Sequence, residues 1–305
     1  MEIYFFKRIR EFFNSFSNVK SCREHFLQNR IKEGVICKKC GSGEHYWLRN
    51  KEQFECKKCK FRTTLRSGTI MQASKLPFSY WYIAMYLMSH SKKSLSALQM
   101  QRELSHKRYE PIWAMMHKIR TLMSKDQESI VMKGFVELDD AFIAVKTPGG
   151  KKNNKQGRGT ITKSSVLVLA ETSDINTKKT KYAKHSAFRK VRFIVSNDLK
   201  SNSIVKNLKN KIESNTIVLT DGYKGYSNLN SGHIGLTIEP IMADKLLPWV
   251  HTSISNVKRM LLGIFHSITP VHLQKYLDEF SFKTNNRNRI DQLFNILLTS
   301  SILCY

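Results

Sequence analysis

The stretch Val136-Glu137-Leu138-Asp139-Asp140-Ala141-Phe142-Ile143 is a β-branched and aromatic run that carries two adjacent carboxylates through its middle. These residue types predict a β-strand, in which acids are unfavourable unless they have a specific use. Because side chains alternate along a strand, Asp139 and Asp140 point to opposite faces. The two aspartates therefore cannot both point at one metal ion, and a site on this strand uses one of them.

Three further strands are predicted after this one, at residues 165–171, 189–195 and 216–220, with a helix at 203–213. The predicted fold class is α/β, with a mixed sheet. The last strand ends in Asp221, and an acid at the carboxyl end of a buried strand lies where α/β sheets place ligand chemistry. A helix-capping role for Asp221 is the alternative interpretation.

A stretch rich in Gly, Lys and Asn, residues 149–159, separates the first two predicted strands. It contains Lys151, Lys152 and Arg158, and it lacks the GxxxxGK pattern of a phosphate-binding loop. The composition predicts a flexible cationic hairpin tip that closes on DNA or is simply solvated.

Four of the six cysteines form two close pairs, Cys37/Cys40 and Cys56/Cys59, with fifteen residues between the pairs. This spacing predicts one tetrahedral Zn²⁺ held by four thiolates, and such a closed site is structural. A redox CxxC pair would need a neighbouring βαβ pattern, which the sequence lacks. Since Cys22 and Cys304 stand alone, the pattern favours a reducing, cytoplasmic location over a disulfide framework.

The net charge is the strongest property of the whole composition, because 51 Lys+Arg against 24 Asp+Glu leave +27 on 305 residues. Such a field favours a polyanionic partner, with DNA or RNA ahead of an anionic membrane surface. No apolar run reaches the 18 residues or more of a spanning helix, so we expect no membrane segment, and we expect no secretory signal.

Basic and aromatic residues alternate within the cysteine-rich segment, which favours a nucleic-acid contact surface over a merely solvated face. The basic residues proposed for this surface are Lys38, Lys39, Lys57 and Lys58. Between about 78 and 124 the apolar residues recur at helical spacing, and short helices with Arg102 on a polar face suit a helix-turn-helix. A simple helical core is the alternative there.

The predicted domain order follows from these patterns. Residues 1–30 form an amphipathic helix, 31–66 a zinc ribbon, 70–126 a helical DNA-binding module, 130–295 the mixed-sheet domain, and 296–305 a helix end. Within the mixed-sheet domain, residues 251–260 open a further helix, for which Ser253 or Ser255 is the expected cap.

Several motifs, in this order, resemble one protein family. They are the zinc ribbon, Ser67-Gly68-Thr69-Ile70, Lys75-Leu76-Pro77, the block 96–104, Val136-Glu137-Leu138-Asp139, Leu219-Thr220-Asp221-Gly222-Tyr223 and the block 272–280. From about Val35 to Arg289 the chain resembles the zinc-ribbon bacterial insertion-sequence transposases of the Merlin-like (ISXO-two-like) group. The resemblance implies a DDE-type catalytic domain with a ribonuclease-H-like fold.

The resemblance also implies site residues. Asp139 matches the first catalytic acid, Asp221 the second, and Asn256, in the Ser-Asn-x-Lys setting, the third position, where part of the group has Glu. These residues would hold two Mg²⁺ or Mn²⁺ ions for phosphoryl transfer, with Lys258 and Arg259 on DNA phosphate. Because an amide oxygen is a neutral ligand, the replacement candidates for the third position are Asp244, Glu239 and Glu279.

The implied function is DNA transposition: cleavage at the ends of an insertion sequence and joining of those ends to target DNA. The partners implied are transposon-end and target DNA and a second copy of the chain, as a homodimer or higher assembly. A catalytically inactive transposase-derived DNA-binding protein is the second hypothesis. A basic zinc-ribbon protein of the RNA machinery is the third, and the spaced acids in a mixed sheet argue against it.

Overall fold

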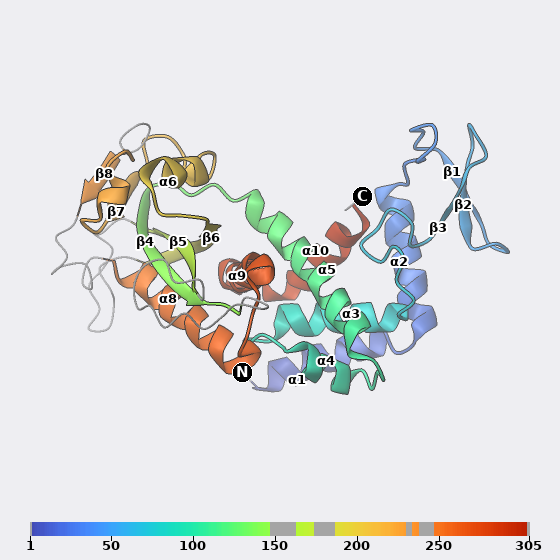
Figure 1. Cartoon of the computed structure of the whole chain (residues 1–305). Helices are drawn as coiled ribbons and strands as arrows, with labels where there is room; N and C mark the ends of the chain where they lie inside the picture. Colours follow the sequence, from blue (N-terminus) through green and yellow to red (C-terminus); the bar gives the residue numbers. More distant parts are fainter. Residues whose placement is uncertain (1, 147–162, 174–186, 230–233, 238–246, 304–305) are drawn as a thin grey trace. The chain divides into compact units, whose positions relative to one another are not determined.

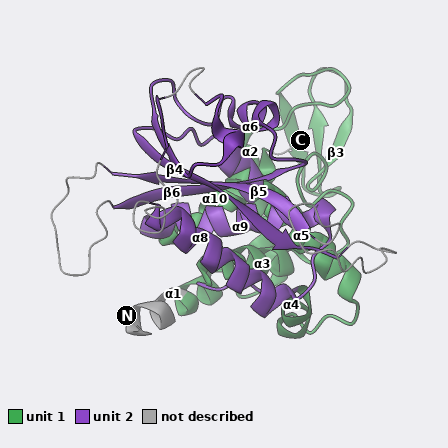
Figure 2. Cartoon of the chain, turned by 60° about the vertical axis from the view of Figure 1, so that its left-hand side comes forward, with its two compact units in different colours: residues 1–91, 97–122, 289–305 green, residues 92–96, 123–288 purple. Residues whose placement is uncertain are grey.

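The structure is a computed structural model of the whole chain, and it describes residues 2–146, 163–173, 187–229, 234–237 and 247–303. It divides into two compact units (Figure 2). Unit 1 comprises residues 1–91, 97–122 and 289–305, and unit 2 comprises residues 92–96 and 123–288. The predicted basic stretch with Lys151, Lys152 and Arg158, and the candidates Glu239 and Asp244, lie outside the described residues.

Unit 2 is built on a five-stranded sheet (Figure 1). Its strands are β4 (Phe135–Ala144), β5 (Lys163–Thr172), β6 (Phe188–Ser196), β7 (Ile217–Thr220) and β8 (Ile234–Thr237), in the order β6-β5-β4-β7-β8. The pairs β4–β5 and β5–β6 are antiparallel, whereas β4–β7 and β7–β8 are parallel. The predicted mixed α/β fold is confirmed, and the sheet is consistent with a ribonuclease-H-like domain.

Both faces of the sheet are covered at β4, β5 and β6, because these strands send apolar side chains in both directions. Ala141 and Ile143 of β4 belong to a core with α8 (Pro248–Met260) and α9 (Pro270–Asn285). Val136 and Leu138 belong to a second core with α6 (Ser201–Leu208). The 3₁₀ turn η1 (Lys224–Tyr226) lies on the α6 face, and the π-helical turn η2 (Leu261–Phe265) follows α8.

The start of α8 differs from the expected one. The helix begins at Pro248, and the Ser253 hydroxyl donates back to the Trp249 carbonyl, so neither Ser253 nor Ser255 caps it. Proline suits the first helical position because its φ angle is already helical and it has no N–H to satisfy. The predicted strands, in contrast, lie within a few residues of the observed β4, β5, β6 and β7.

Unit 1 contains a small antiparallel sheet and several helices. The sheet is β1 (His45–Leu48), β2 (Gln53–Cys56) and β3 (Arg62–Thr64), and the helices are α1 (Glu2–Ser15), α2 (Val19–Glu33), α3 (Phe78–His90), α4 (Ala97–Glu103), α5 (Tyr109–Glu128), whose last turns belong to unit 2, and α10 (Leu293–Ile302). The 3₁₀ segment η3 (Arg287–Gln292) precedes α10. Trp47 packs on Phe54 across β1 and β2, which form an antiparallel hairpin within the predicted ribbon.

The predicted N-terminal helix is two helices, α1 and α2. The break occurs because Asn18 is extended (φ −147°) and forms a reciprocal capping box with Ser21, which starts a new helix. Aromatic contacts hold α1 within unit 1. The ring of Phe12 stacks on that of Tyr86 of α3, with 4.1 Å between the ring centroids, and packs edge-on against Phe294 of α10, with 5.2 Å between the centroids. No described helix has the length and apolar character needed to cross a bilayer.

Candidate metal and catalytic sites

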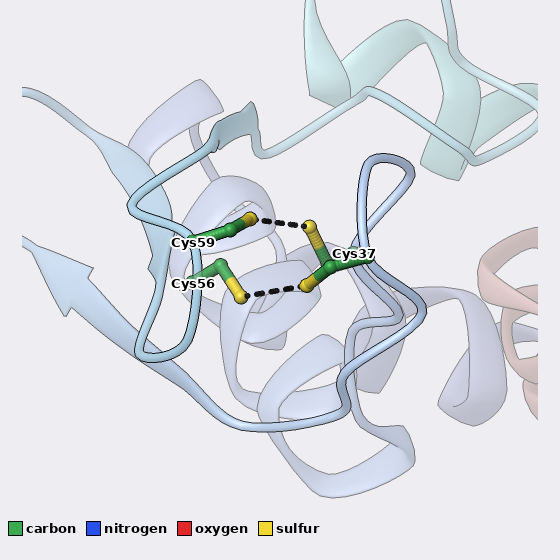
Figure 3. Close-up of side chains that lie close together, drawn as sticks. Cys37, Cys56 and Cys59 are labelled. Atoms are coloured by element: carbon green, nitrogen blue, oxygen red, sulfur yellow. Dashed lines mark hydrogen bonds between the residues drawn. The ribbon is translucent and has the colours of Figure 1, made fainter.

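The four paired cysteines converge at one end of the ribbon in unit 1. Cys37 and Cys40 lie before β1, Cys56 ends β2, and Cys59 lies in the turn after it. The sulfur atoms Cys37 Sγ and Cys59 Sγ are 3.5 Å apart, as are Cys40 Sγ and Cys56 Sγ (Figure 3). All four ligand atoms lie within 4.8 Å of one another.

This cluster fits a structural zinc ion. Zn–S bonds of about 2.3 Å in a tetrahedron place the sulfur atoms about 3.8 Å apart, close to the observed separations. The four thiols influence one another: a hydrogen bond from the Cys59 backbone lowers the pKa of Cys56, whereas the pKa of Cys40 is raised, with the neighbouring Cys59 thiol as the largest raising cause. With four protein ligands the site has no open position, so the predicted structural role is the one that its chemistry allows.

The predicted nucleic-acid surface of the ribbon combines charge with an exposed ring. Tyr46 is 46% exposed, and the ammonium groups of Lys57 and Lys60 lie 5.6 Å and 5.5 Å from its ring centroid. Lys39 and Lys58 are exposed, and Lys38 donates to Gln72 Oε1 at 3.1 Å. Arg102 is also exposed, in the last turn of α4.

The two aspartates singled out as catalytic acids lie on neighbouring parallel strands of unit 2. The β4–β7 register pairs Glu137 with Leu219 and Leu138 with Thr220. Asp139 is the next residue within β4, and Asp221 is the residue that directly follows β7. Because parallel strands run in step, these two acids meet at the same edge of the sheet.

Asp139 and Asp140 use opposite faces of β4, as alternation predicts. Asp139 Oδ2 lies 3.2 Å from His251 Nε2 on α8, whereas Asp140 Oδ1 accepts a hydrogen bond from the Tyr226 hydroxyl at 3.3 Å. Burial, followed by the charges of Asp140, Asp139 and Asp221, raises the pKa of Tyr226 far above its usual range. The Tyr226 hydroxyl therefore stays protonated and remains a donor beside the acids.

The amino end of α8 is held against β4 by Glu137, which sequence reasoning did not assign to the site. Glu137 is 2% exposed, and its Oε2 atom accepts hydrogen bonds from the backbone N–H groups of Trp249 and Val250, each at 2.8 Å. A carboxylate is favourable there because the first N–H groups of a helix are otherwise unpaired and carry partial positive charge. The sequence did contain a signal for Glu137: side chains alternate along a strand, so Glu137, two residues before Asp139, is on the same face of β4.

Asn256 lies on a different side of α8 from His251. Its side chain is exposed, and its Oδ1 atom accepts a hydrogen bond from Arg259 Nη2 at 2.7 Å. Asn256 and Arg259 line a cavity of about 580 Å³, and the side chains of Lys92, Lys93 and Lys283 also line it. The structure thus places Asn256 among cations and brings His251, rather than Asn256, into contact with Asp139.

The remaining candidates are placed as follows. Lys258 and Arg259 are both exposed on α8. Glu279 of α9 is fully buried and pairs with Lys283 at 3.1 Å, which is a structural contact. Among the described residues, the four cysteines form a group of side chains that could hold a metal ion, whereas Asp139, Asp221 and His251 do not form such a group.

The acid site suits a hard divalent cation in its donor chemistry. Asp139 and Asp221 supply carboxylate oxygens on adjacent strands, and Mg²⁺ and Mn²⁺ prefer oxygen ligands. One oxygen of each is already oriented by the backbone, since Asp139 Oδ1 accepts from the Asp140 N–H at 2.8 Å and Asp221 Oδ1 from the Tyr223 N–H at 3.2 Å. The second oxygen of each carboxylate can serve an ion.

Two families match the sequence. Residues 131–285 match the ISXO2-like transposase domain, and residues 18–62 match the transposase zinc-ribbon domain. The zinc-ribbon match begins at Asn18, the residue that caps α2. No curated protein matches the chain.

Proposed function

Because this chain belongs to the ISXO2-like transposases, we propose that it cleaves the ends of an insertion sequence and joins them to target DNA by phosphoryl transfer. The observation that supports this proposal is the parallel pairing of β4 with β7 up to Leu138 and Thr220, since Asp139 and Asp221 are the residues that follow this pair. Hydrolysis at each transposon end frees a 3′-hydroxyl, and that hydroxyl attacks a target phosphodiester with a 3′-bridging oxygen as the leaving group.

Asp139 and Asp221 hold the divalent cations in this proposal. When two Mg²⁺ or Mn²⁺ ions are bound, they activate the attacking oxygen and stabilise the leaving oxygen of the displacement. Asn256 is the third position by family resemblance, and His251 is the residue that contacts Asp139. Asp140 supports the site from the opposite face of β4 through Tyr226.

DNA is held by basic surfaces on both units. In unit 2, the cavity beside Asn256 carries Lys92, Lys93, Arg259 and Lys283, which suits a phosphate backbone. The zinc ribbon (31–66), in unit 1, and the helical module (70–126), most of which is in unit 1, recognise the transposon ends, and the catalytic domain (130–295) lies mostly in unit 2. Because transposition joins two ends, the active species is a homodimer or a larger assembly.

The test is strand transfer on a paired-end DNA substrate with Mg²⁺ or Mn²⁺. The wild-type chain should join ends, and Asp139→Ala and Asp221→Ala should not, while both variants still bind end DNA. Equal joining by the wild type and by these variants would reject the proposed catalytic site. A wild type that binds ends but never cleaves them would instead support a transposase-derived DNA-binding protein.

A further inference from the structure

We propose that a cavity beside the turn between α4 and α5 binds one unstacked nucleotide of DNA. This inference rests on the proposed function, because the nucleotide belongs to the transposon-end or target DNA. The cavity has a volume of about 550 Å³ and is lined by the loop before α3, by α3, by the α4–α5 turn and by α5. All of its lining residues lie in unit 1 and within the helical module 70–126.

The inner wall of this cavity is apolar. Leu76, Trp81 and Met115 line it and are 6%, 0% and 1% exposed. Pro77 and Pro111 extend the same wall. The volume falls within the range of roughly 300–1,000 Å³ that is usual for pockets that enclose a small organic group. Such a wall is suited to cover the face of a flat apolar group.

Cations also line the cavity, and none of its lining residues is an acid. Lys75 and Arg108 are exposed, and neither side chain has an ion-pair or hydrogen-bond partner among the described residues. Lys118 lines the cavity as well, and its Nζ atom donates to the Gln72 carbonyl at 2.9 Å. Unpaired cations next to an apolar wall suit a ligand that combines a flat apolar part with an anionic part.

Hydrogen bonds hold two sides of the cavity in place. In the α4–α5 turn, Gln101 Nε2 donates to the His106 carbonyl at 3.0 Å, and His106 Nδ1 lies 2.8 Å from the Arg108 carbonyl. In the loop before α3, the Arg66 guanidinium donates to the Ser74 carbonyl. Because these contacts already order the two segments, a ligand loses little affinity to ordering them.

A nucleotide has both of the parts that the cavity suits, since its base has an apolar face and its phosphate is anionic. Stacking covers the base faces in a duplex, so only an unpaired or extruded nucleotide can place its base in a cavity. A phosphate contact alone would need the cations but not the apolar wall. The transposase family and the net charge of +27 favour a nucleotide over an acidic peptide.

The experiment measures the affinity of the full chain for three DNA duplexes by fluorescence anisotropy, without divalent cations so that no strand is cleaved. The duplexes share one sequence: the first is fully paired, the second carries one unpaired adenine nucleotide, and the third carries an abasic nucleotide at that position. The ratio of the last two affinities reports the contribution of the base. We expect the wild type to bind the adenine duplex about 10-fold more tightly than the abasic duplex, as for one base stacked on protein side chains.

Two pairs of variants test whether this cavity holds the base. Ala114 lines the cavity and is exposed, so a larger side chain there can fill the space. Ala114→Phe should reduce the preference for adenine to within about twofold, and Ala114→Ser should keep it. Arg108→Ala should weaken binding of the adenine duplex about fivefold, whereas Lys107→Ala, at an exposed neighbour that does not line the cavity, should stay within about twofold. Thermal denaturation checks that each variant folds.

The outcomes separate this inference from the proposed function. If the wild type does not distinguish the adenine duplex from the abasic one, or if Ala114→Phe keeps the preference, the cavity does not bind a nucleotide. End joining that depends on Asp139 would still support the proposed function in that case. If free dAMP binds as tightly as the adenine duplex, the cavity takes free nucleotides and its assignment to DNA is wrong. If the wild type binds none of the duplexes, the proposed function fails as well.

Discussion

The zinc ribbon and the proposed acid site are of opposite construction in one chain. The four zinc ligands come from residues 37–59, and their sulfur atoms lie within 4.8 Å of one another. The proposed acid site would take Asp139 from β4, Asp221 from the residue after β7 and a residue of α8, which are far apart in the chain. A short hairpin can build the first site, whereas the second exists only when a sheet and a helix are assembled.

This difference determines how each site should respond to change. The ribbon depends on its ion, because so small a sheet buries few apolar residues. The acid site depends on the protein around it, because strand pairing and the anchoring of α8 position its groups. Four predictions test this contrast, from the largest expected effect to the smallest.

Removing zinc should unfold the ribbon. Structural zinc contributes an apparent 10–16 kcal/mol, roughly, in small zinc modules at neutral pH. We expect Cys56→Ser, or treatment with a strong chelator, to abolish zinc binding and to change the fluorescence of Trp47, which packs on Phe54. Metal content and fluorescence are measured on the full chain. Cys22→Ser, at a cysteine outside the cluster, is the control and should retain zinc.

Asp139→Asn and Asp140→Asn form a matched pair at adjacent positions. The first removes a charged ligand and should reduce strand transfer about 10³-fold, equivalent to about 4 kcal/mol of transition-state stabilisation. The second removes a charge on the opposite face and should cost about 10-fold or less. Strand-transfer rates at saturating DNA give both values. Equal losses would mean that alternation along β4 does not separate the two roles.

Glu137→Ala should destabilise unit 2 without touching a metal ligand. Two buried N–H groups of α8 would lose their acceptor, at a cost of about 2–3 kcal/mol. Urea denaturation monitored by circular dichroism measures the loss. The control, Glu213→Ala, changes an exposed glutamate and should stay within about 0.5 kcal/mol of wild type. If Glu137→Ala has the same stability as wild type, the two hydrogen bonds from Glu137 do not anchor α8.

Cation removal from the cavity beside Asn256 should have the smallest effect. Arg259→Ala and Lys93→Ala should each lower the slope of log affinity for DNA against log salt by about 0.9, the value for one phosphate contact. Fluorescence anisotropy over a salt series measures this slope. Lys209→Ala, just after α6 on the opposite face of the sheet, should leave it unchanged.

Alternation and helical spacing predicted much of the fold, but they did not place the groups that meet from distant elements. Asp139 and Asp140 were correctly assigned to opposite faces because side-chain direction in a strand is a local property. The start of α8 was wrong because the usual capping residues, Ser253 and Ser255, lie inside the helix. The first N–H groups of α8 are instead bound by Glu137, which lies 112 positions before Trp249. A local sequence pattern cannot predict a partner so distant in the chain.

The sequence alone determined the zinc cluster, the mixed sheet and its acids, and the family. These features depend on residue spacing and on periodicity, which are local properties of the sequence. Only the tertiary structure decided which side chain of α8 faces Asp139. The rotation of a helix about its axis is set by what it buries and what anchors its end, here Val250, Val257 and Glu137. That rotation brings His251 to Asp139 and leaves Asn256 in a cavity lined by lysine and arginine side chains.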